Sequence, residues 1–204
     1  MGDLGSVPPK ALREALLAVD VQKGFMPGIE PGYGELPAPD GAAVAAPLAA
    51  LADRVGLVVA TGDSHTPDHS SFVAQGGPWP VHCVAGSPGA ELHPLISAVL
   101  TPGWFFPKGT ERDSDAYSAF PVSDLAGRLQ AEGIERLLIG GLVTNVCVRA
   151  TALDALAAGF EVVIIADGCR AVAADGLLSG EESLAELEAA GALITTSVEL
   201  LRDR

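Results

Sequence analysis

The sequence has few cysteines and no long apolar run. Three cysteines, Cys83, Cys147 and Cys169, are too few for a disulfide framework, which indicates a reducing compartment, by default the cytoplasm. No apolar run approaches the roughly 18 residues that a membrane-spanning helix needs. The N-terminal residues have neither a basic region nor an apolar stretch, so we expect no secretory signal there.

Basic residues are scarce as well. The chain has 12 lysines and arginines against 26 aspartates and glutamates, and its formal net charge is −14 at pH 7. We therefore expect neither nucleic acid nor an anionic membrane surface as a partner, because both attract positively charged proteins. No glycine-rich phosphate-binding loop follows a predicted strand either.

Apolar residues, in contrast, make up 49% of the 204 positions, which indicates a folded domain with a sizeable core. We expect residues 1–14 to form a short tail and residues 15–204 a single domain, since no repeat or linker divides them. Short, continuous apolar runs alternate with helical patterns. This alternation predicts an α/β fold, a three-layer Rossmann-like parallel sheet of about six strands with helices on both faces.

The expected strands cover residues 15–21, 57–61, 104–106, 137–141, 161–166 and 192–196. The expected helices cover about residues 40–54, 121–132, 146–158 and 179–190, and a capping box from Ser179 to Glu182 begins the last one. Residues 26–41, rich in glycine and proline, interrupt the first crossover, and one interpretation is a loop that covers a site.

Polar or reactive side chains follow four of the expected strands. Asp20 ends the first strand, Asp63 and His65 follow the second, Lys108 follows the third along the chain and Cys147 the fourth. In open parallel sheets, ligands bind beyond the carboxyl ends of the strands. We therefore expect these side chains to converge at one edge of the sheet.

Cys147 stands between a strand that ends in two glycines and an alanine-rich helix. A helix N-terminus stabilises a thiolate, which is the nucleophilic form of cysteine. Asp20, desolvated at the end of a buried strand, is expected to have a raised pKa suited to proton transfer, although it can also simply cap a turn. Lys108 can pair with Asp20 and polarise the thiol, or else be a solvated loop lysine.

Asp63, His65 and His82 are candidate metal ligands. One carboxylate and two imidazoles with open coordination positions suit a catalytic divalent ion, zinc first, with manganese or iron as alternatives. Scattered loop histidines are the structural alternative. His69 is either a fourth ligand or a structural hydrogen-bonding residue, and Cys83 is interpreted as a small buried residue, since neighbours in an extended segment point in opposite directions.

Aromatic residues make up only 5% of the chain, yet Phe25, Trp79 and Tyr117 lie near these motifs. They can line a pocket for a flat ring. Ordinary core packing is the alternative, most of all for Phe25.

Together these residues resemble the isochorismatase-like cysteine hydrolases, and most closely their nicotinamidase (pyrazinamidase) branch, from about Leu16 to Ser197. The segment that includes Trp79 and His82 separates nicotinamidases from other members, because it supplies a metal ligand that those members usually lack. The motifs that carry the resemblance are Asp20-Val-Gln22 with Phe25, Thr61-Gly-Asp63-Ser-His65 with His69-Ser-Ser-Phe72, Gly76-Gly-Pro-Trp-Pro-Val-His-Cys-Val84, Gly86-Ser-Pro-Gly89, Lys108-Gly-Thr110, Asp115-Ala-Tyr-Ser-Ala-Phe120, and Gly141-Leu-Val-Thr144 with Cys147-Val148.

The resemblance implies a metal-dependent amidohydrolase that converts nicotinamide to nicotinate and ammonia in NAD salvage, and that also hydrolyses pyrazinamide. It implies Cys147 as the nucleophile that forms a thioester, Asp20 as the general acid and base, and Lys108 as the third member of a catalytic triad. It also implies a cis peptide between Leu142 and Val143, and an oxyanion stabilised by the backbone N–H groups of Val143 and Cys147.

For binding, the resemblance implies one metal ion and one small-molecule substrate, nicotinamide. The implied metal ligands are Asp63, His65 and His82, and the implied substrate-binding residues are Phe25, Trp79 and Tyr117. Three segments depart from the family's common pattern: Lys23-Gly24 replaces an Asn-Asp pair, Ser64 a bulky aromatic residue, and Asn145-Val146 the frequent Asp-Tyr. These departures leave pocket shape, rate and substrate preference open.

Two other functions remain open at this stage. A superfamily amidase that acts on a carbamoyl or ureido substrate would keep Asp20, Lys108 and Cys147 but would not need the His82 segment. A catalytically silent binding module would need none of the three residues to converge. The sequence also leaves open whether the chain forms a homo-oligomer.

Overall fold

The computed structural model describes residues 13–202, so the predicted tail lies outside the described residues up to residue 12. The strands are β1 (Glu14–Val19), β2 (Leu57–Asp63), β3 (Phe105–Lys108), β4 (Arg136–Leu142), β5 (Glu161–Arg170) and β6 (Leu193–Thr195). The helices are α1 (Ala45–Ala50), α2 (Pro94–Val99), α3 (Leu125–Ala131), α4 (Arg149–Ala157), α5 (Gly180–Ala189) and α6 (Ser197–Arg202). No helix in this part of the chain has the length and apolar character to cross a membrane.

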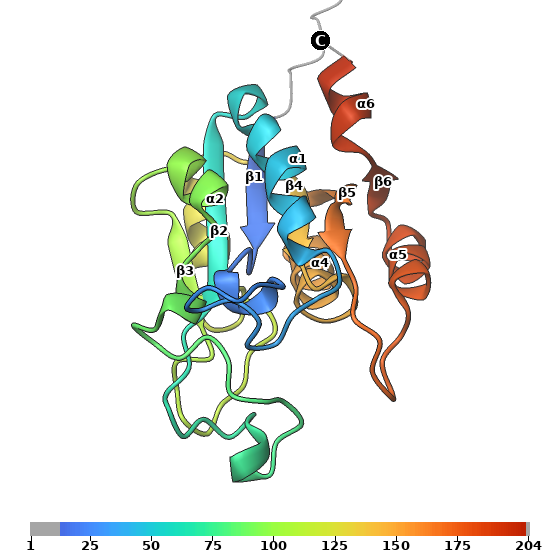
Figure 1. Cartoon of the computed structure of the whole chain (residues 1–204). Coiled ribbons are helices and arrows are strands. Elements are labelled where there is room, and N and C mark those ends of the chain that lie inside the picture. The colour runs from blue at the N-terminus through green and yellow to red at the C-terminus, as the bar shows by residue number, and fades with distance from the viewer. Residues whose placement is uncertain (1–12, 203–204) are drawn as a thin grey trace, which may run out of the picture.

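All six strands are parallel and form one sheet in the order β3-β2-β1-β4-β5-β6, which confirms the predicted α/β fold (Figure 1). The predicted helix at 40–54 is reduced to α1 with 3₁₀ turns on both sides, and Pro47 lies in the first turn of α1, where proline is tolerated. Helices α2 and α6 were not predicted, because six residues are too few to show a helical period. The capping box from Ser179 to Glu182 at α5 is confirmed.

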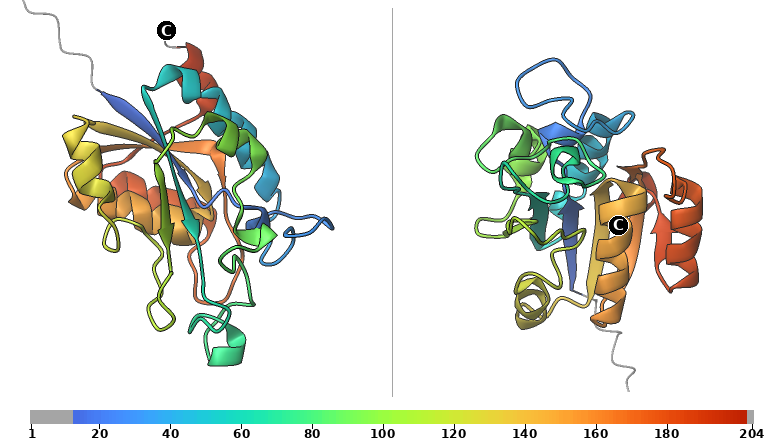
Figure 2. Two further views of the ribbon diagram at one scale, coloured as in Figure 1. Left: turned by 90° about the vertical axis from the view of Figure 1, so that its left-hand side faces the viewer. Right: turned by 90° about the horizontal axis from the view of Figure 1, so that it is seen from below.

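The central strands are buried on both faces, as their continuous apolar runs predict. Along β1, the side chains of Leu17 and Val19 enter a core under α3, α4 and α5, whereas Leu16 and Ala18 enter a second core under α1, α2 and α6. Figure 2 shows helices on both sides of the sheet. This three-layer packing fixes the strand ends relative to one another.

The strand order reverses between β1 and β4. From β1 the chain proceeds to β2 and β3 on one side, and from β4 to β5 and β6 on the other. At such a reversal the connections diverge to opposite faces and leave a crevice beyond the carboxyl ends of the two strands. Asp20 directly follows β1, and the turn after β4 carries Cys147, so both lie at this crevice.

Strands β1 and β4 approach each other closely at Gly141. This residue has a φ of 138°, and a Cβ atom at this position would lie 1.9 Å from the carbonyl oxygen of Val19. Glycine is therefore required for the two central strands to pair up to the edge where the crevice begins.

We expect Gly141→Ala to lower the free energy of unfolding by more than ~3 kcal/mol, because the new methyl group collides with the backbone of Val19. Gly127→Ala on α3 is the matched control, since a Cβ atom there meets no atom within 4 Å. We expect that control to be neutral or to stabilise by about 0.5–1 kcal/mol. Denaturant unfolding measures both, and a Gly141→Ala variant as stable as the wild type would contradict the close approach.

Candidate active site

Three buried side chains from three strand ends meet in the crevice. Lys108 Nζ lies 2.8 Å from Oδ2 of Asp20 and 3.6 Å from Sγ of Cys147. Lys108 is the last residue of β3, two strands away from β1. Its long side chain therefore extends across the end of β2 to reach Asp20 and Cys147. The structure thus brings the three predicted residues together and excludes a solvated loop lysine, since Lys108 is 1% exposed.

The same ammonium group binds a second carboxylate. Asp63 ends β2 beside Lys108 in the register of the sheet, and its Oδ1 lies 2.5 Å from Lys108 Nζ. Burial alone would lower the pKa of Lys108, but the carboxylates of Asp20 and Asp63 outweigh burial and hold that pKa well above its usual value. Lys108 is therefore a permanent cation between two carboxylates.

Asp20 has the environment of a proton carrier. Burial raises its pKa above the ordinary value, although the charge of Lys108 opposes the rise. Thr61 donates a hydrogen bond of 2.7 Å to Oδ1, which fixes the orientation of the carboxylate. The direction of this shift agrees with the raised pKa predicted from the sequence.

The prediction that Cys147 is a stabilised thiolate is wrong. The thiol lies in a π-helical turn, Thr144–Val148, that precedes α4, and burial raises its pKa well above the ordinary value despite Lys108 nearby. A buried thiol of this kind needs a base. A carboxylate oxygen of Asp20 lies within 4.8 Å of its sulfur and can take the proton.

The second cluster consists of Asp63, His65 and His82, whose ligand atoms lie within 4.8 Å of one another. The Nε2 atoms of His65 and His82 lie 3.6 and 3.8 Å from Oδ2 of Asp63. The Nδ1 atoms of these two rings lie 2.9 Å from the carbonyl oxygen of Gly109 and 2.7 Å from that of Pro80. Because N–H groups at Nδ1 satisfy the carbonyls, both Nε2 lone pairs are directed toward the carboxylate, as in a metal site.

This donor set fits a divalent ion. One carboxylate oxygen and two imidazole nitrogens leave coordination positions for a ligand, which is the pattern of a catalytic rather than a structural zinc site. Burial favours a protonated Asp63, but Lys108 and His65 outweigh it and hold its pKa below the ordinary range. An anionic carboxylate is therefore ready to bind a cation.

Gln22, for which no role was predicted, holds the backbone of the metal-ligand candidate Asp63. Its Oε1 accepts a 2.8 Å hydrogen bond from the N–H of Asp63, and its Nε2 donates to the carbonyl oxygens of Asp63 and Ala90, both at 2.8 Å. The sequence signal for it was its place in the Asp20-Val-Gln22 motif. Since all three bonds are to backbone atoms, Gln22 fixes the position of the Asp63 backbone.

Neither His69 nor Cys83 belongs to the metal cluster. The two ring nitrogens of His69 lie 2.7 Å from Ser71 Oγ and 3.4 Å from the carbonyl oxygen of Ser114, which supports the structural alternative. Cys83 is completely buried, which confirms its interpretation as a small buried residue.

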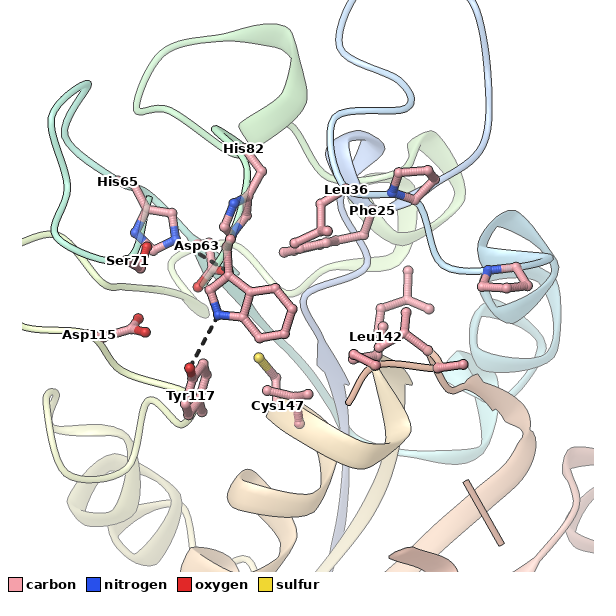
Figure 3. A pocket seen from close by; sticks show the side chains of 18 residues that line it. Phe25, Leu36, Asp63, His65, Ser71, His82, Asp115, Tyr117, Leu142 and Cys147 are labelled. Atoms are coloured by element: carbon pink, nitrogen blue, oxygen red, sulfur yellow. Dashed lines mark hydrogen bonds and ion pairs between the residues drawn. The ribbon is translucent and has the colours of Figure 1, made fainter. Parts of the chain in front are cut away.

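Cys147 and the Asp63–His65–His82 cluster line one pocket of about 360 Å³. Figure 3 shows the polar groups on one side, Phe25, Leu36 and Leu142 on the other, and Cys147 between them. Trp79 and Tyr117 also line the pocket, and Trp79 Nε1 donates a 3.2 Å hydrogen bond to Tyr117 Oη. The predicted aromatic lining is thus present.

Several lining residues were missed from the sequence. Leu36, Pro37 and Pro39 belong to the glycine- and proline-rich segment, so that segment does border a site. The missed residues outside it include Ser71 and Asp115, together with Val172, Ala173 and Ala174 from the loop after β5. The peptide between Leu142 and Val143 is cis, as the resemblance implies, and both residues line the pocket.

Comparison with known proteins agrees with this geometry. The isochorismatase domain matches residues 14–199. A nicotinamidase of Escherichia coli (strain K12) is 35% identical, over 93% of this chain and 96% of that protein. Among solved structures, the pyrazinamidase of Pyrococcus horikoshii in complex with zinc has a TM-score of 0.78 at 39% identity, covering 90% of this chain and 99% of that chain. PnC1 from L. infantum in complex with nicotinate has a TM-score of 0.79 at 35% identity, covering 91% and 93%.

We expect the purified protein to bind one divalent ion per chain, and His82→Ala to weaken zinc binding by more than about 100-fold, because the variant loses one of three ligands. His93→Ala is the matched control, since His93 caps α2 through Nδ1 and lies outside the cluster. Titration of the metal-free protein with zinc against a competing chelator measures the affinities. Equal zinc affinity in His82→Ala and wild-type protein would refute the assigned ligand set.

Proposed function

Since this chain belongs to the isochorismatase family, we propose that it is a nicotinamidase, which hydrolyses nicotinamide to nicotinate and ammonia. The observation that carries the proposal is the position of Cys147 and the Asp63–His65–His82 cluster on one pocket. The thiol can attack a carboxamide while the cluster holds the ring that bears it. The relatives from Escherichia coli and Pyrococcus horikoshii support both halves of this assignment.

The chemistry begins with the thiol. Asp20 accepts the proton of Cys147, and the sulfur attacks the carboxamide carbon to form a tetrahedral oxyanion. The C–N bond then breaks, Asp20 returns the proton to the departing amine so that ammonia leaves, and an acyl thioester remains on Cys147. Water gives a proton to Asp20 and attacks the thioester carbon, nicotinate departs, and the thiolate takes that proton back.

Lys108 keeps its proton throughout this sequence. It holds the Asp20 carboxylate beside the sulfur and offsets the negative charge of the thiolate, 3.6 Å away. The oxyanion is assigned to the backbone N–H groups of Val143 and Cys147, and such donors contribute about 3 kcal/mol each in other enzymes.

Asp63, His65 and His82 would hold a divalent ion, for which we propose zinc, with manganese and iron as alternatives. When bound, such an ion would supply a Lewis acid that can coordinate the pyridine nitrogen of the substrate. Phe25 and Trp79 would hold the ring between them and Tyr117 would line the pocket wall, so that the carboxamide is oriented toward Cys147. The same geometry accommodates pyrazinamide, which also has a nitrogen in the ring.

The specific position of His82 distinguishes this function from the alternatives. An amidase for carbamoyl or ureido substrates needs Cys147, Asp20 and Lys108 but has no use for a ring-binding metal cluster. A silent binding module would not need Asp20, Lys108 and Cys147 to lie together. The contacts of Lys108 with Asp20 and Cys147 therefore support an enzyme.

We expect the zinc-loaded protein to release ammonia from nicotinamide, and Cys147→Ala to lower kcat by more than about 10⁴-fold, because no acyl acceptor remains. Cys169→Ala is the matched control: it removes a buried thiol from the hydrophobic core and keeps the pocket lining. A coupled ammonia assay measures each rate. If the zinc-loaded wild type releases no ammonia, the nicotinamidase assignment fails.

We also expect kcat/KM to favour nicotinamide over benzamide, which lacks the ring nitrogen, by more than about 100-fold in the metal-loaded wild type. His82→Ala should lose most of this preference, because the ring nitrogen then has no partner. The ratio of the two kcat/KM values is the relevant measurement. An unchanged ratio in His82→Ala would contradict recognition of the ring through the cluster.

A further inference from the structure

One wall of the pocket is a surface loop that also borders a second cavity. Residues 171–178 connect β5 to α5, and Val172, Ala173 and Ala174 line the pocket. The same three residues also line a second cavity, of about 610 Å³, together with Leu177 and Leu178. Since these residues border two cavities, close packing alone does not hold this wall in place.

Asn145 ties this loop to the turn that carries the nucleophile. Its Nδ2 donates hydrogen bonds to the carbonyl oxygens of Val172 and Leu178, at 2.8 and 2.7 Å, and its Oδ1 accepts a 3.2 Å bond from the N–H of Val172. The loop is therefore held at its beginning and at its end by one side chain. Asn145 is 5% exposed, does not itself line the pocket, and stands two positions before Cys147.

The bonding pattern requires an amide. An ionised aspartate, the residue frequent at this position in the family, has no donor for two carbonyl oxygens and would instead place negative charge against both. An asparagine satisfies both carbonyls and the N–H at once. The amide of Asn145 therefore provides the donors and the acceptor that the loop backbone requires.

We propose that Asn145 is a positioning residue that fixes the 171–178 loop as the apolar wall of the pocket and so sets the size of the carboxamide that reaches Cys147. This inference rests on the proposed function, because it concerns the substrate of the same pocket. Without the three hydrogen bonds the wall can shift, because a second cavity borders it, and carboxamides with a larger ring fit.

The test compares wild type, Asn145→Ala and Asn145→Asp, all zinc-loaded, with nicotinamide and with ring-methylated nicotinamides. We expect KM for nicotinamide to rise more than kcat falls, and the ratio of kcat/KM for methylated over plain substrate to rise about tenfold in both variants. Ser179→Ala is the control: it removes the cap of α5 just after the loop without touching the three bonds. We expect it to lower Tm but to keep the substrate ratio of the wild type.

A second readout does not depend on nicotinamide hydrolysis. Alkylation of Cys147 by N-methylmaleimide and by the bulkier N-phenylmaleimide measures access to the thiol, with Cys147→Ala to identify the labelled site. We expect the phenyl-to-methyl rate ratio to rise in both Asn145 variants and to stay constant in Ser179→Ala. Unchanged ratios in the Asn145 variants, or an equal rise in Ser179→Ala, overturn the proposal. A wild type that hydrolyses no nicotinamide removes the proposed function, and the maleimide ratios then still decide the role of Asn145.

Discussion

The site depends on one buried cation between two carboxylates. Lys108, from the edge strand β3, binds Asp20 at the end of β1 and Asp63 at the end of β2, and thereby joins Asp20 and Cys147 to the Asp63–His65–His82 cluster. Each charge is buried, and a buried charge is stable only when it is paired. Without the lysine, two carboxylates would face each other out of water, and neither cluster could keep its arrangement.

The sheet order explains why these residues meet. Since β3, β2, β1 and β4 are adjacent in that order, their carboxyl ends present Lys108, Asp63, Asp20 and the turn to Cys147 in a row. The reversal between β1 and β4 opens the crevice where the thiol lies. The approach at Gly141 allows the two strands to remain paired up to this point. A backbone constraint at a residue that does not line the pocket therefore helps to determine the distances on which the chemistry relies.

Much of this arrangement is predictable from the sequence, because it depends on local signals. Continuous apolar runs predicted the parallel sheet, and polar residues at the strand ends predicted the convergence of Asp20, Lys108 and Cys147. The behaviour of the thiol was not predictable, because its pKa depends on the depth of burial rather than on the helix that follows. The roles of Gln22 and Asn145 were also missed, since each acts through backbone atoms of segments distant in the chain.

The proposed mechanism requires the carboxamide carbon to become bonded to the sulfur of Cys147. The most direct measurement is acid quenching of the enzyme during turnover of nicotinamide, followed by mass spectrometry of the intact protein and of its peptides. We expect a nicotinoyl adduct on the peptide that contains Cys147. This adduct should form before nicotinate and disappear when the substrate is exhausted. Ammonia release without any such adduct, or with the adduct on another residue, would contradict it.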